Sequence, residues 1–445
     1  MPPAPDPLPN GEREASLISA CASLLFANGQ TTYRTVSDVQ RLAAALDQQV
    51  TVLVNWDHLI IRYVRRDGGF HDNVAVSPIG VDMHKVASTI ETIDKVCAGQ
   101  MDPGSALREL GAIAKSPPVS VIRFAVMAGS GAAALAVIFG SAHWLSLVLI
   151  AISAGAGACL RRWVAGLTHN AFVQPLSAAL LAGIVGAIAA RAELSSSLRL
   201  IAVCPCMVLV PGPHLLNGAI DLVRARIALG IARLVLAGLI ILMVCTGLLA
   251  GLALGGVSLP VSGSSAPVPF AYDVLAAGIA VAAYGTFFSM PWRTLPVPVA
   301  IGMVAHATRW VAITIAGASI EMGALVACLL VGTVVTPIAD KMRMPFAAFA
   351  FASVVSLIPG VYLFRMASGL VILASPGGQA SPSVLLDVIS DGSTAMLVLM
   401  AMTFGLIVPK MCIESFYPRQ ARQSPIQRAA TEAANDPVRT VVDGR

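Results

Sequence analysis

The 445-residue chain has little charge, because 12% of its residues are Asp, Glu, Lys or Arg, whereas soluble globular domains contain about 25%. It also has few aromatic residues, at 6%, while 56% of its residues are apolar. Such a composition argues against a chain folded entirely in water, since a water-exposed surface is rich in charged side chains. With a mean hydropathy of +0.79, the sequence predicts an integral membrane protein.

Patterns typical of secretion, metal binding and common enzyme chemistry are also missing. Residues 1–14 are rich in proline and lack a basic region followed by an apolar one, so they predict no secretory signal. The eight cysteines show no paired spacing and lie mostly in apolar runs, which predicts neither a disulfide nor a metal site. The polar N-terminal region lacks a nucleotide-binding loop and a Gly-x-Ser-x-Gly motif. We therefore expect no cofactor, no nucleic-acid partner and no catalytic residue.

Charge is distributed unevenly along the chain. The first hundred or so residues and the last thirty are polar, and the region between them is nearly free of charge except at segment ends. A helix needs about 20 mainly apolar residues to cross a bilayer. Such segments predict ten spans, at approximately 120–140, 143–160, 171–190, 198–220, 229–252, 272–290, 296–311, 315–338, 346–373 and 393–415.

Basic residues in the connections between spans predict the orientation. Alternate connections contain arginine, as at Arg161, Arg162 and Arg224, whereas the long connections 255–271 and 374–392 contain no basic residue. Because cytoplasmic loops have the excess of Lys and Arg, both termini should face the cytoplasm. The chain is thus expected to be a multi-pass protein of the bacterial inner membrane.

The polar N-terminal region reads as a compact domain. Apolar residues at helical spacing alternate there with short β-rich runs near 50–54, 59–64 and 73–76. The predicted fold class is a mainly α, polytopic membrane protein preceded by a small cytoplasmic α/β domain. The predicted domains are a disordered start at 1–13, the α/β domain at 14–116, a five-helix repeat at 117–254, an external loop at 255–271, a second five-helix repeat at 272–416 and a disordered cytoplasmic tail at 417–445.

Two Pro-Gly pairs, at 211–212 and 359–360, interrupt apolar segments 148 positions apart. Proline removes an amide hydrogen and clashes with the carbonyl four residues earlier, so it breaks a membrane helix and bares backbone polar groups. The segments 160–165 and 308–312 also resemble each other. Since five spans per half is an odd number, the halves would have opposite orientations. The sequence predicts an inverted repeat with a transporter site between the broken fourth and ninth spans.

The residues beside each break are candidates for binding a substrate. The first amides of the resumed helices would suit a carboxylate, because they lack intrahelical acceptors and have partial positive charge. The carbonyls freed at Met207 and Val355 would suit an ammonium or hydroxyl group. Alternatively, the prolines only kink helices for packing. The predicted substrate-binding residues are Pro211, Gly212, His214, Asn217, Pro359, Gly360, Tyr362 and Arg365.

Few ionisable residues lie within the spans, so each is a functional candidate. Asp221 lies one helical turn beyond Asn217 and could carry a coupling proton or pair with a substrate amine. An ion pair with Arg224 at the membrane surface explains Asp221 equally well. Arg365, at the position equivalent to Asn217, could hold a carboxylate or extend to the membrane surface.

Two further residues are candidates for proton coupling. His306 and Glu321 could belong to a proton path, although a polar span end explains each of them as well. Asp273 begins a span and is interpreted as interfacial. These residues leave open which ionisable group would move the proton.

Several short segments have a recognisable order and spacing. They are Leu24–Val36, Ala106–Leu110, Val208–Pro213, Phe287–Arg293 and Leu357–Gly360. In these segments the chain resembles the threonine/serine exporters, a family of ten-span amino-acid exporters with a cytoplasmic N-terminal domain. The resemblance covers nearly all of 14–418.

The resemblance implies export of L-threonine and L-serine driven by the proton gradient, with protons, these amino acids and the lipid bilayer as partners. Where relatives have a Gly-Gly-Asp-like turn after the first span, this chain has no acid in 139–144, so a role of that carboxylate does not carry over. The alternatives are export of dicarboxylates such as succinate, or a membrane-tethered enzyme or sensor whose head is the active part. Small residues at 129–131 and 155–157 would permit close helix contacts within one subunit or in a homo-oligomer.

Overall fold

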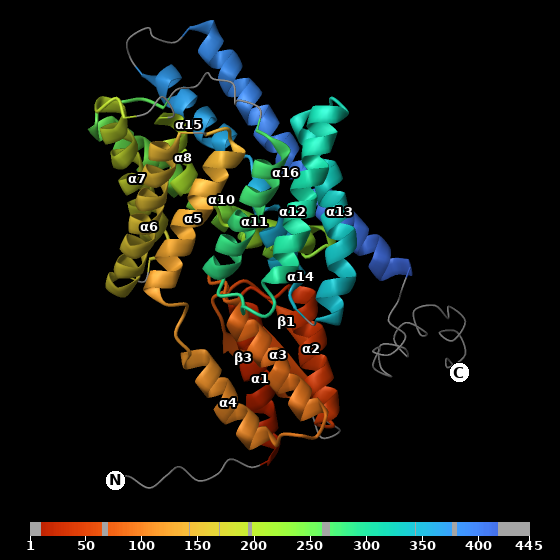
Figure 1. Cartoon of the computed structure of the whole chain (residues 1–445). Helices are drawn as coiled ribbons and strands as arrows, with labels where there is room; N and C mark the ends of the chain where they lie inside the picture. Colours follow the sequence, from red (N-terminus) through yellow and green to blue (C-terminus); the bar gives the residue numbers. More distant parts are fainter. Residues whose placement is uncertain are drawn as a thin grey trace, which may run out of the picture.

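A computed structural model of the protein describes residues 10–64, 70–141, 143–168, 170–194, 198–259, 268–342, 344–375 and 381–416. Figure 1 shows a small head region at one end of a larger helical region. Nearly all of the predicted disordered ends and much of the predicted external loop lie outside the described residues. Helix α1 begins at Asn10, before the predicted start of the head at residue 14.

The head contains the helices and strands that the periodicity predicts. They are α1 (Asn10–Ala27), α2 (Thr32–Ala45), β1 (Gln49–Val54), β2 (His58–Val64), β3 (Phe70–Ala75), α3 (Met83–Cys97) and α4 (Pro103–Lys115). The carboxylate of Asp82 accepts two amides at the start of α3, and Asp102 does the same for α4. These side chains satisfy amides that have no acceptor within the helix, so each fixes where its helix begins.

The three strands form one antiparallel sheet in the order β1-β2-β3, with Val52 opposite Ile61 and Ile61 opposite Asp72. Ile61 and Tyr63 are buried on one face of the sheet, and the Tyr63 hydroxyl donates to the Ala15 carbonyl of α1 at 3.1 Å. Cys21 is also buried, and burial raises the pKa of its thiol. It thus packs as a small apolar residue in the head core.

Above the head, eight helices are long and apolar enough to cross a membrane. They are α5 (Val121–Ile138), α6 (Trp144–Leu167), α7 (Val173–Arg191), α10 (Ile227–Leu254), α11 (Phe270–Phe287), α12 (Pro296–Trp310) with its π-helical extension η1 (Val311–Ile315), α13 (Ile320–Lys341) and α16 (Pro382–Phe416). The described residues therefore form a polytopic, mainly helical membrane protein with a small three-stranded sheet.

Two further apolar segments are bent pairs of helices. The first is α8 (Leu198–Met207) followed by α9 (Gly212–Val223), bent by 54°. The second is α14 (Phe346–Val354), with the short η2 (Val355–Leu357), followed by α15 (Gly360–Ala374), bent by 61°. Counting each pair as one span gives up to ten spans among the described residues. Both breaks fall at the Pro-Gly pairs, as predicted.

Helix α16 begins at Pro382, earlier than the predicted start near 393. Asp387 and Asp391, interpreted from the sequence as part of an outer connection, therefore lie within the helix. Asp391 is buried, and its carboxylate lies 3.0 Å from the Nε atom of Arg365 on α15. The acid is tolerated inside the helix because a cation compensates its charge.

Small residues bring corresponding helices into close contact. A Cβ atom on Gly183 of α7 would lie 2.3 Å from the Leu248 carbonyl oxygen of α10. A Cβ atom on Gly332 of α13 would lie 2.6 Å from the Gly405 carbonyl oxygen of α16. Both approaches exclude any side chain larger than hydrogen, so these helix pairs associate through backbone packing.

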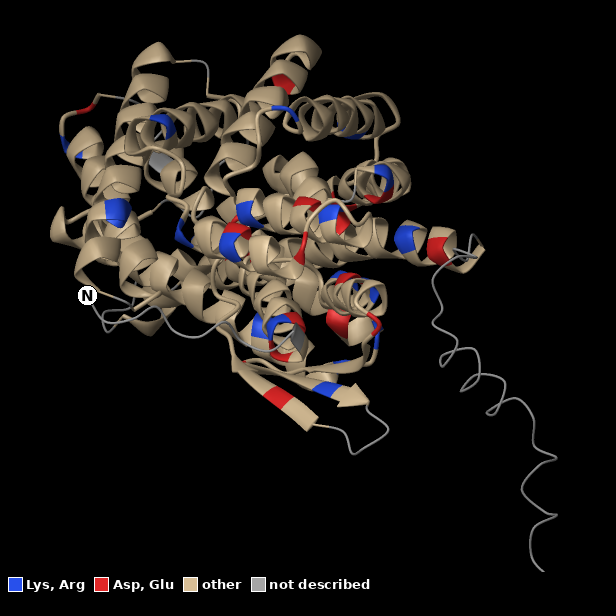
Figure 2. Cartoon of the chain, turned by 90° about the horizontal axis from the view of Figure 1, so that it is seen from below, with Lys and Arg blue, Asp and Glu red and all other residues tan. Residues whose placement is uncertain are grey.

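The charged residues are placed where the chain can keep them hydrated or paired. Seen from the head end, Lys, Arg, Asp and Glu gather on the head and near its contact with the helices, while long stretches of the other helices have none (Figure 2). This arrangement leaves an apolar outer surface on the helical region, as a bilayer requires.

Candidate functional site

The two Pro-Gly breaks share one backbone conformation. Pro211 has φ −83° and ψ 61°, and Pro359 has φ −78° and ψ 42°. The Gly212 amide donates to the Val210 carbonyl at 2.9 Å, and the Gly360 amide donates to the Ile358 carbonyl at 2.8 Å. Each proline is thus the centre of a three-residue turn of the inverse γ type. The turns bend both segments sharply without reversing the direction of the chain.

The two breaks interlock in the middle of the helical region. A Cβ atom on Gly212 would lie 1.5 Å from the Phe351 ring of α14, and one on Gly360 would lie 2.8 Å from the Met207 side chain of α8. Each break therefore contacts the broken helix of the other half of the chain. Glycine is required at Gly212 because the ring of Phe351 occupies the place of a side chain.

Most of the backbone groups expected to bind a substrate already have partners. The amides of His214 and Leu215 donate to the Pro211 carbonyl at 3.1 and 3.3 Å. The Met207 carbonyl accepts the Tyr284 hydroxyl at 2.6 Å, and the Val355 carbonyl accepts the Ile358 amide at 3.3 Å.

The amides at the start of α9 are thus bonded within the chain in this conformation, and the carboxylate site on them stays a prediction. The same holds for the Gly360 amide and for the carbonyls of Met207 and Val355. The γ-turns bond only the Gly212 and Gly360 amides, and the other groups bond to neighbouring backbone or to the Tyr284 hydroxyl.

The polar face of α9 contacts the head. His214 Nε2 lies 3.0 Å from the Ile79 carbonyl oxygen. The Asn217 amide nitrogen donates to the Gly29 carbonyl at 3.2 Å, and the Thr32 hydroxyl donates to the Asp221 carboxylate at 3.0 Å. The three predicted site residues of α9 therefore hold the head against the first broken segment.

Asp221 also belongs to a buried ion-pair cluster. Its carboxylate lies 3.1 Å from Arg233 Nε and 3.7 Å from an Arg226 nitrogen, and Arg233 is 1% exposed. Arg224 instead pairs with Glu414, so the considered pair between Asp221 and Arg224 is wrong. Sequence spacing favoured the wrong arginine because Arg233 comes from the next helix, α10, which packs back against α9.

Arg365 and Glu321 occupy less central positions than the sequence suggested. Arg365 pairs with Asp391, as described above, so its charge is compensated within the fold. Glu321 lies in the first turn of α13 and, of the described residues, does not line either cavity beside the breaks.

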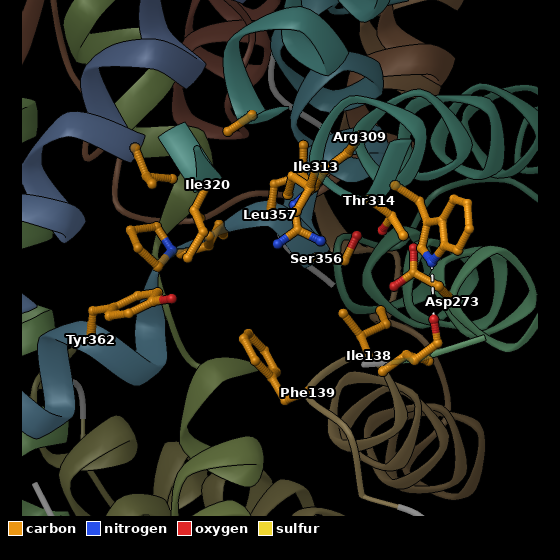
Figure 3. Close-up of a pocket in the computed structure, with 16 residues that line it drawn as sticks. Ile138, Phe139, Asp273, Arg309, Ile313, Thr314, Ile320, Ser356, Leu357 and Tyr362 are labelled. Atoms are coloured by element: carbon orange, nitrogen blue, oxygen red, sulfur yellow. Dashed lines mark hydrogen bonds between the residues drawn. The ribbon is translucent and has the colours of Figure 1, made fainter. Parts of the chain in front are cut away.

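A cavity of about 350 Å³ reaches the second break from the end far from the head. Its lining residues include Asp273, Arg309, Ser356, Pro359 and Tyr362. Figure 3 shows the Arg309 guanidinium and the Tyr362 hydroxyl pointing into this space, with Asp273 on its wall. The far cavity, defined by these residues, brings together a cation, an anion and hydroxyl groups.

A hydrogen-bonded chain of three buried side chains lies behind the far cavity. His306 Nδ1 is 3.0 Å from Asp273 Oδ2, and His306 Nε2 is 2.6 Å from the Ser356 hydroxyl. Asp273 is 3% exposed and lies in the first turn of α11, and His306 is fully buried. Sequence reasoning selected His306 but missed Asp273 and Ser356, since they come from α11 and η2, far away in the chain.

A second cavity, of about 570 Å³, reaches the first break from the head end. It is lined by Val210, Pro211, His214 and Arg161, and by part of the head at 79–82. Arg161 lies over the Phe287 ring, with its guanidinium carbon 4.7 Å from the ring centre. This second cavity, the near cavity, therefore also ends at a Pro-Gly break with an arginine beside it.

Several residues that line the two cavities lie at one constant separation in the chain. Val210, Pro211, His214 and Arg161 of the near cavity correspond, at the same separation of 148 residues, to residues of the far cavity. Those residues are Ile358, Pro359, Tyr362 and Arg309. The sequence signal for Arg309 was present in the similarity of 160–165 to 308–312.

Apolar helices, interlocked breaks and cavities at opposite ends define a polytopic membrane transport protein. A family model described as "Putative threonine/serine exporter" (ThrE) matches residues 16–255, and a second described as "Threonine/Serine exporter, ThrE" matches residues 273–412. The chain belongs to the threonine/serine exporter family. No solved structure matches it.

Proposed function

We propose that the protein exports small polar amino acids, L-threonine and L-serine, across the cytoplasmic membrane by alternating access driven by the proton gradient. The observation that supports this function is the pair of cavities, which approach the interlocked breaks from opposite ends. A transporter of this kind exposes one central site to each side in turn, and broken helices from the two halves form that site.

An inverted five-plus-five repeat is part of the proposal. The packing of α7 along α10 and of α13 along α16, and the identical turns at the two breaks, support it. The head and both termini lie on the cytoplasmic side in this arrangement. The near cavity then opens toward the cytoplasm and the far cavity toward the outside.

Counterflow in proteoliposomes containing the full-length protein tests the substrate. We expect labelled threonine and serine to exchange and labelled succinate not to exchange. Exchange of succinate alone would overturn the assignment in favour of a dicarboxylate exporter. The pairing of Arg365 with Asp391 argues against that alternative, because it compensates the cation on which a second carboxylate was expected to bind.

Replacing Pro211 and Pro359 with alanine tests the role of the breaks. Alanine allows the helical hydrogen bonds to form across the break, so we expect the double variant to insert in the membrane and to lose export. Pro337 lies within α13 away from both breaks, so Pro337→Ala is the matched control and should retain export. Undiminished export by the double variant would refute the proposed site.

A further inference from the structure

We propose that the far cavity is a binding site for a zwitterionic amino acid in which the substrate ammonium and a proton on His306 compensate the same carboxylate, that of Asp273. This inference rests on the proposed export function and assigns to it the residues that couple substrate to proton. It uses Asp273, Arg309 and Ser356, which the sequence did not place in a site.

The far cavity matches an amino-acid zwitterion in charge. Of its described lining residues, Arg309 is the cation, Asp273 is the anion and Tyr362 is the remaining ionisable group. The Arg309 guanidinium points into the cavity (Figure 3), so it can take the substrate carboxylate in a bidentate contact. The substrate ammonium then pairs with the Asp273 carboxylate.

Hydroxyl groups on the cavity wall suit the side chains of threonine and serine. Ser356 and Thr314 line the cavity, and the Tyr362 hydroxyl points into it (Figure 3). A hydroxyl can both donate and accept a hydrogen bond. A site built to bond a substrate hydroxyl discriminates against an analogue without one, because its own polar groups would be left unpaired.

The carboxylate of Asp273 needs a compensating charge because it is buried. With His306 neutral, the Asp273–His306 pair carries one negative charge and can hold an ammonium. Protonation at His306 Nε2 gives an imidazolium, and the pair becomes neutral. A substrate ammonium bound beside the neutral pair would be a buried charge without a counterion. The Asp273–His306 pair therefore binds either the proton or the substrate ammonium, but not both.

Ser356 connects His306 to the cavity. The imidazole has no exposed surface, but the Ser356 hydroxyl lies 2.6 Å from Nε2 and also lines the cavity. A proton from the outside can be accepted by the hydroxyl oxygen while the hydroxyl proton passes to Nε2. The proton balance closes, since one proton enters at Ser356 and one is bound at His306.

The remaining groups around His306 do not duplicate this function. Asp273 faces it from α11, and Arg309 on its own helix interacts electrostatically with Asp273 and with Tyr362 of α15. Helix α14 has no ionisable side chain, and Glu321 at the start of α13 does not line the cavity. Asp273 is therefore the carboxylate whose compensation changes when His306 titrates.

The direction of coupling fits an exporter. On the acidic outer side a proton binds His306, the Asp273–His306 pair becomes neutral and the amino acid leaves. After the site turns to the less acidic cytoplasm the proton leaves, and the pair regains the negative charge that binds the next ammonium. One proton moves inward for each amino acid that moves outward.

Equilibrium binding of labelled L-threonine to the full-length protein at about pH 5 and about pH 8, well to either side of the ordinary histidine pKa of about 6.5, tests the inference. We expect wild-type affinity to be about tenfold lower at the acidic pH, since a proton then occupies the compensating position. His306→Gln should bind equally at both pH values. Asp273→Asn and Arg309→Gln should lose binding at both, and Arg309→Lys should retain part of it.

Asp387→Asn is the matched control, because Asp387 lies on α16 outside the cavity lining and should leave binding and its pH dependence unchanged. Thermal unfolding of each variant identifies any that fail to fold. If the other variants fail to fold, binding by His306→Gln and Arg309→Lys tests the inference. Wild-type binding without pH dependence, or pH dependence retained in His306→Gln, would overturn the inference and leave amino-acid export intact. Failure of the wild type to bind threonine at either pH would instead refute the proposed substrate.

Discussion

The first and second breaks have the same backbone turn but different polar surroundings. At the first break, the side chains of His214, Asn217 and Asp221 bond to the head. At the second, Ser356 and Tyr362 face a cavity that reaches the opposite end of the molecule. One backbone turn, present twice, can thus serve both to attach a domain and to line a cavity, and the side chains around it decide which.

The largest effect is expected from the charges that distinguish the two breaks. Asp221→Asn leaves Arg233 buried without an acid, which should destabilise the protein by about 3–5 kcal/mol. Asp391→Asn is the matched change near the second break and should have a smaller effect, because the Arg365 side chain is 14% exposed and that of Arg233 is 1% exposed. Thermal unfolding of the purified variants measures both.

The double variant Asp221→Asn with Arg233→Met is the control for this prediction. Removing both charges should restore much of the lost stability, since no buried cation is then left unpaired. If Asp221→Asn and Asp391→Asn lowered the stability of the protein equally, the different burial of Arg233 and Arg365 would not determine the cost of removing the acid.

The two break glycines should differ in their tolerance of a side chain. Gly212→Ala puts a Cβ atom 1.5 Å from the Phe351 ring, whereas Gly360→Ala puts one 2.8 Å from the flexible Met207 side chain. We expect a loss of about 3 kcal/mol for Gly212→Ala and about 1 kcal/mol for Gly360→Ala, the upper and lower parts of the range for overpacking.

Thermal unfolding again provides the measurement, and Gly212→Ala with Phe351→Ala is the compensating variant. Making room at residue 351 should recover part of the loss caused by the new methyl group. If the double variant is less stable than either single variant, the contact between the two breaks does not limit the side chain at residue 212.

A smaller effect is expected where the head attaches. Thr32→Val removes the hydroxyl that donates to Asp221 and should destabilise the protein by about 2 kcal/mol, the typical contribution of one hydrogen bond to a charged group. Limited proteolysis of the segment between head and helices should become faster. Thr51→Val, on strand β1 away from this contact, is the control and should not change the rate of cleavage.

Sequence reasoning found the apolar spans and the two breaks because their signals are local. The periodicity and length of a span are properties of about 20 consecutive residues, and proline acts on the turn that contains it. The partners of Asp221, Asp273 and Arg365 were not found, because each comes from another helix. Spacing alone therefore favoured Arg224 over Arg233 and placed Asp391 outside its helix.

A polytopic membrane protein with a polar head and two matched helix breaks follows from the amino-acid sequence alone. Composition, run length and proline positions carry that information without reference to any contact. Helix packing is needed to see that the breaks interlock, that the first is attached to the head, and that Asp273, His306 and Ser356 meet beside the second. The physical reason is that buried charges and hydrogen bonds depend on which helices pack together, and that packing joins residues far apart in the chain.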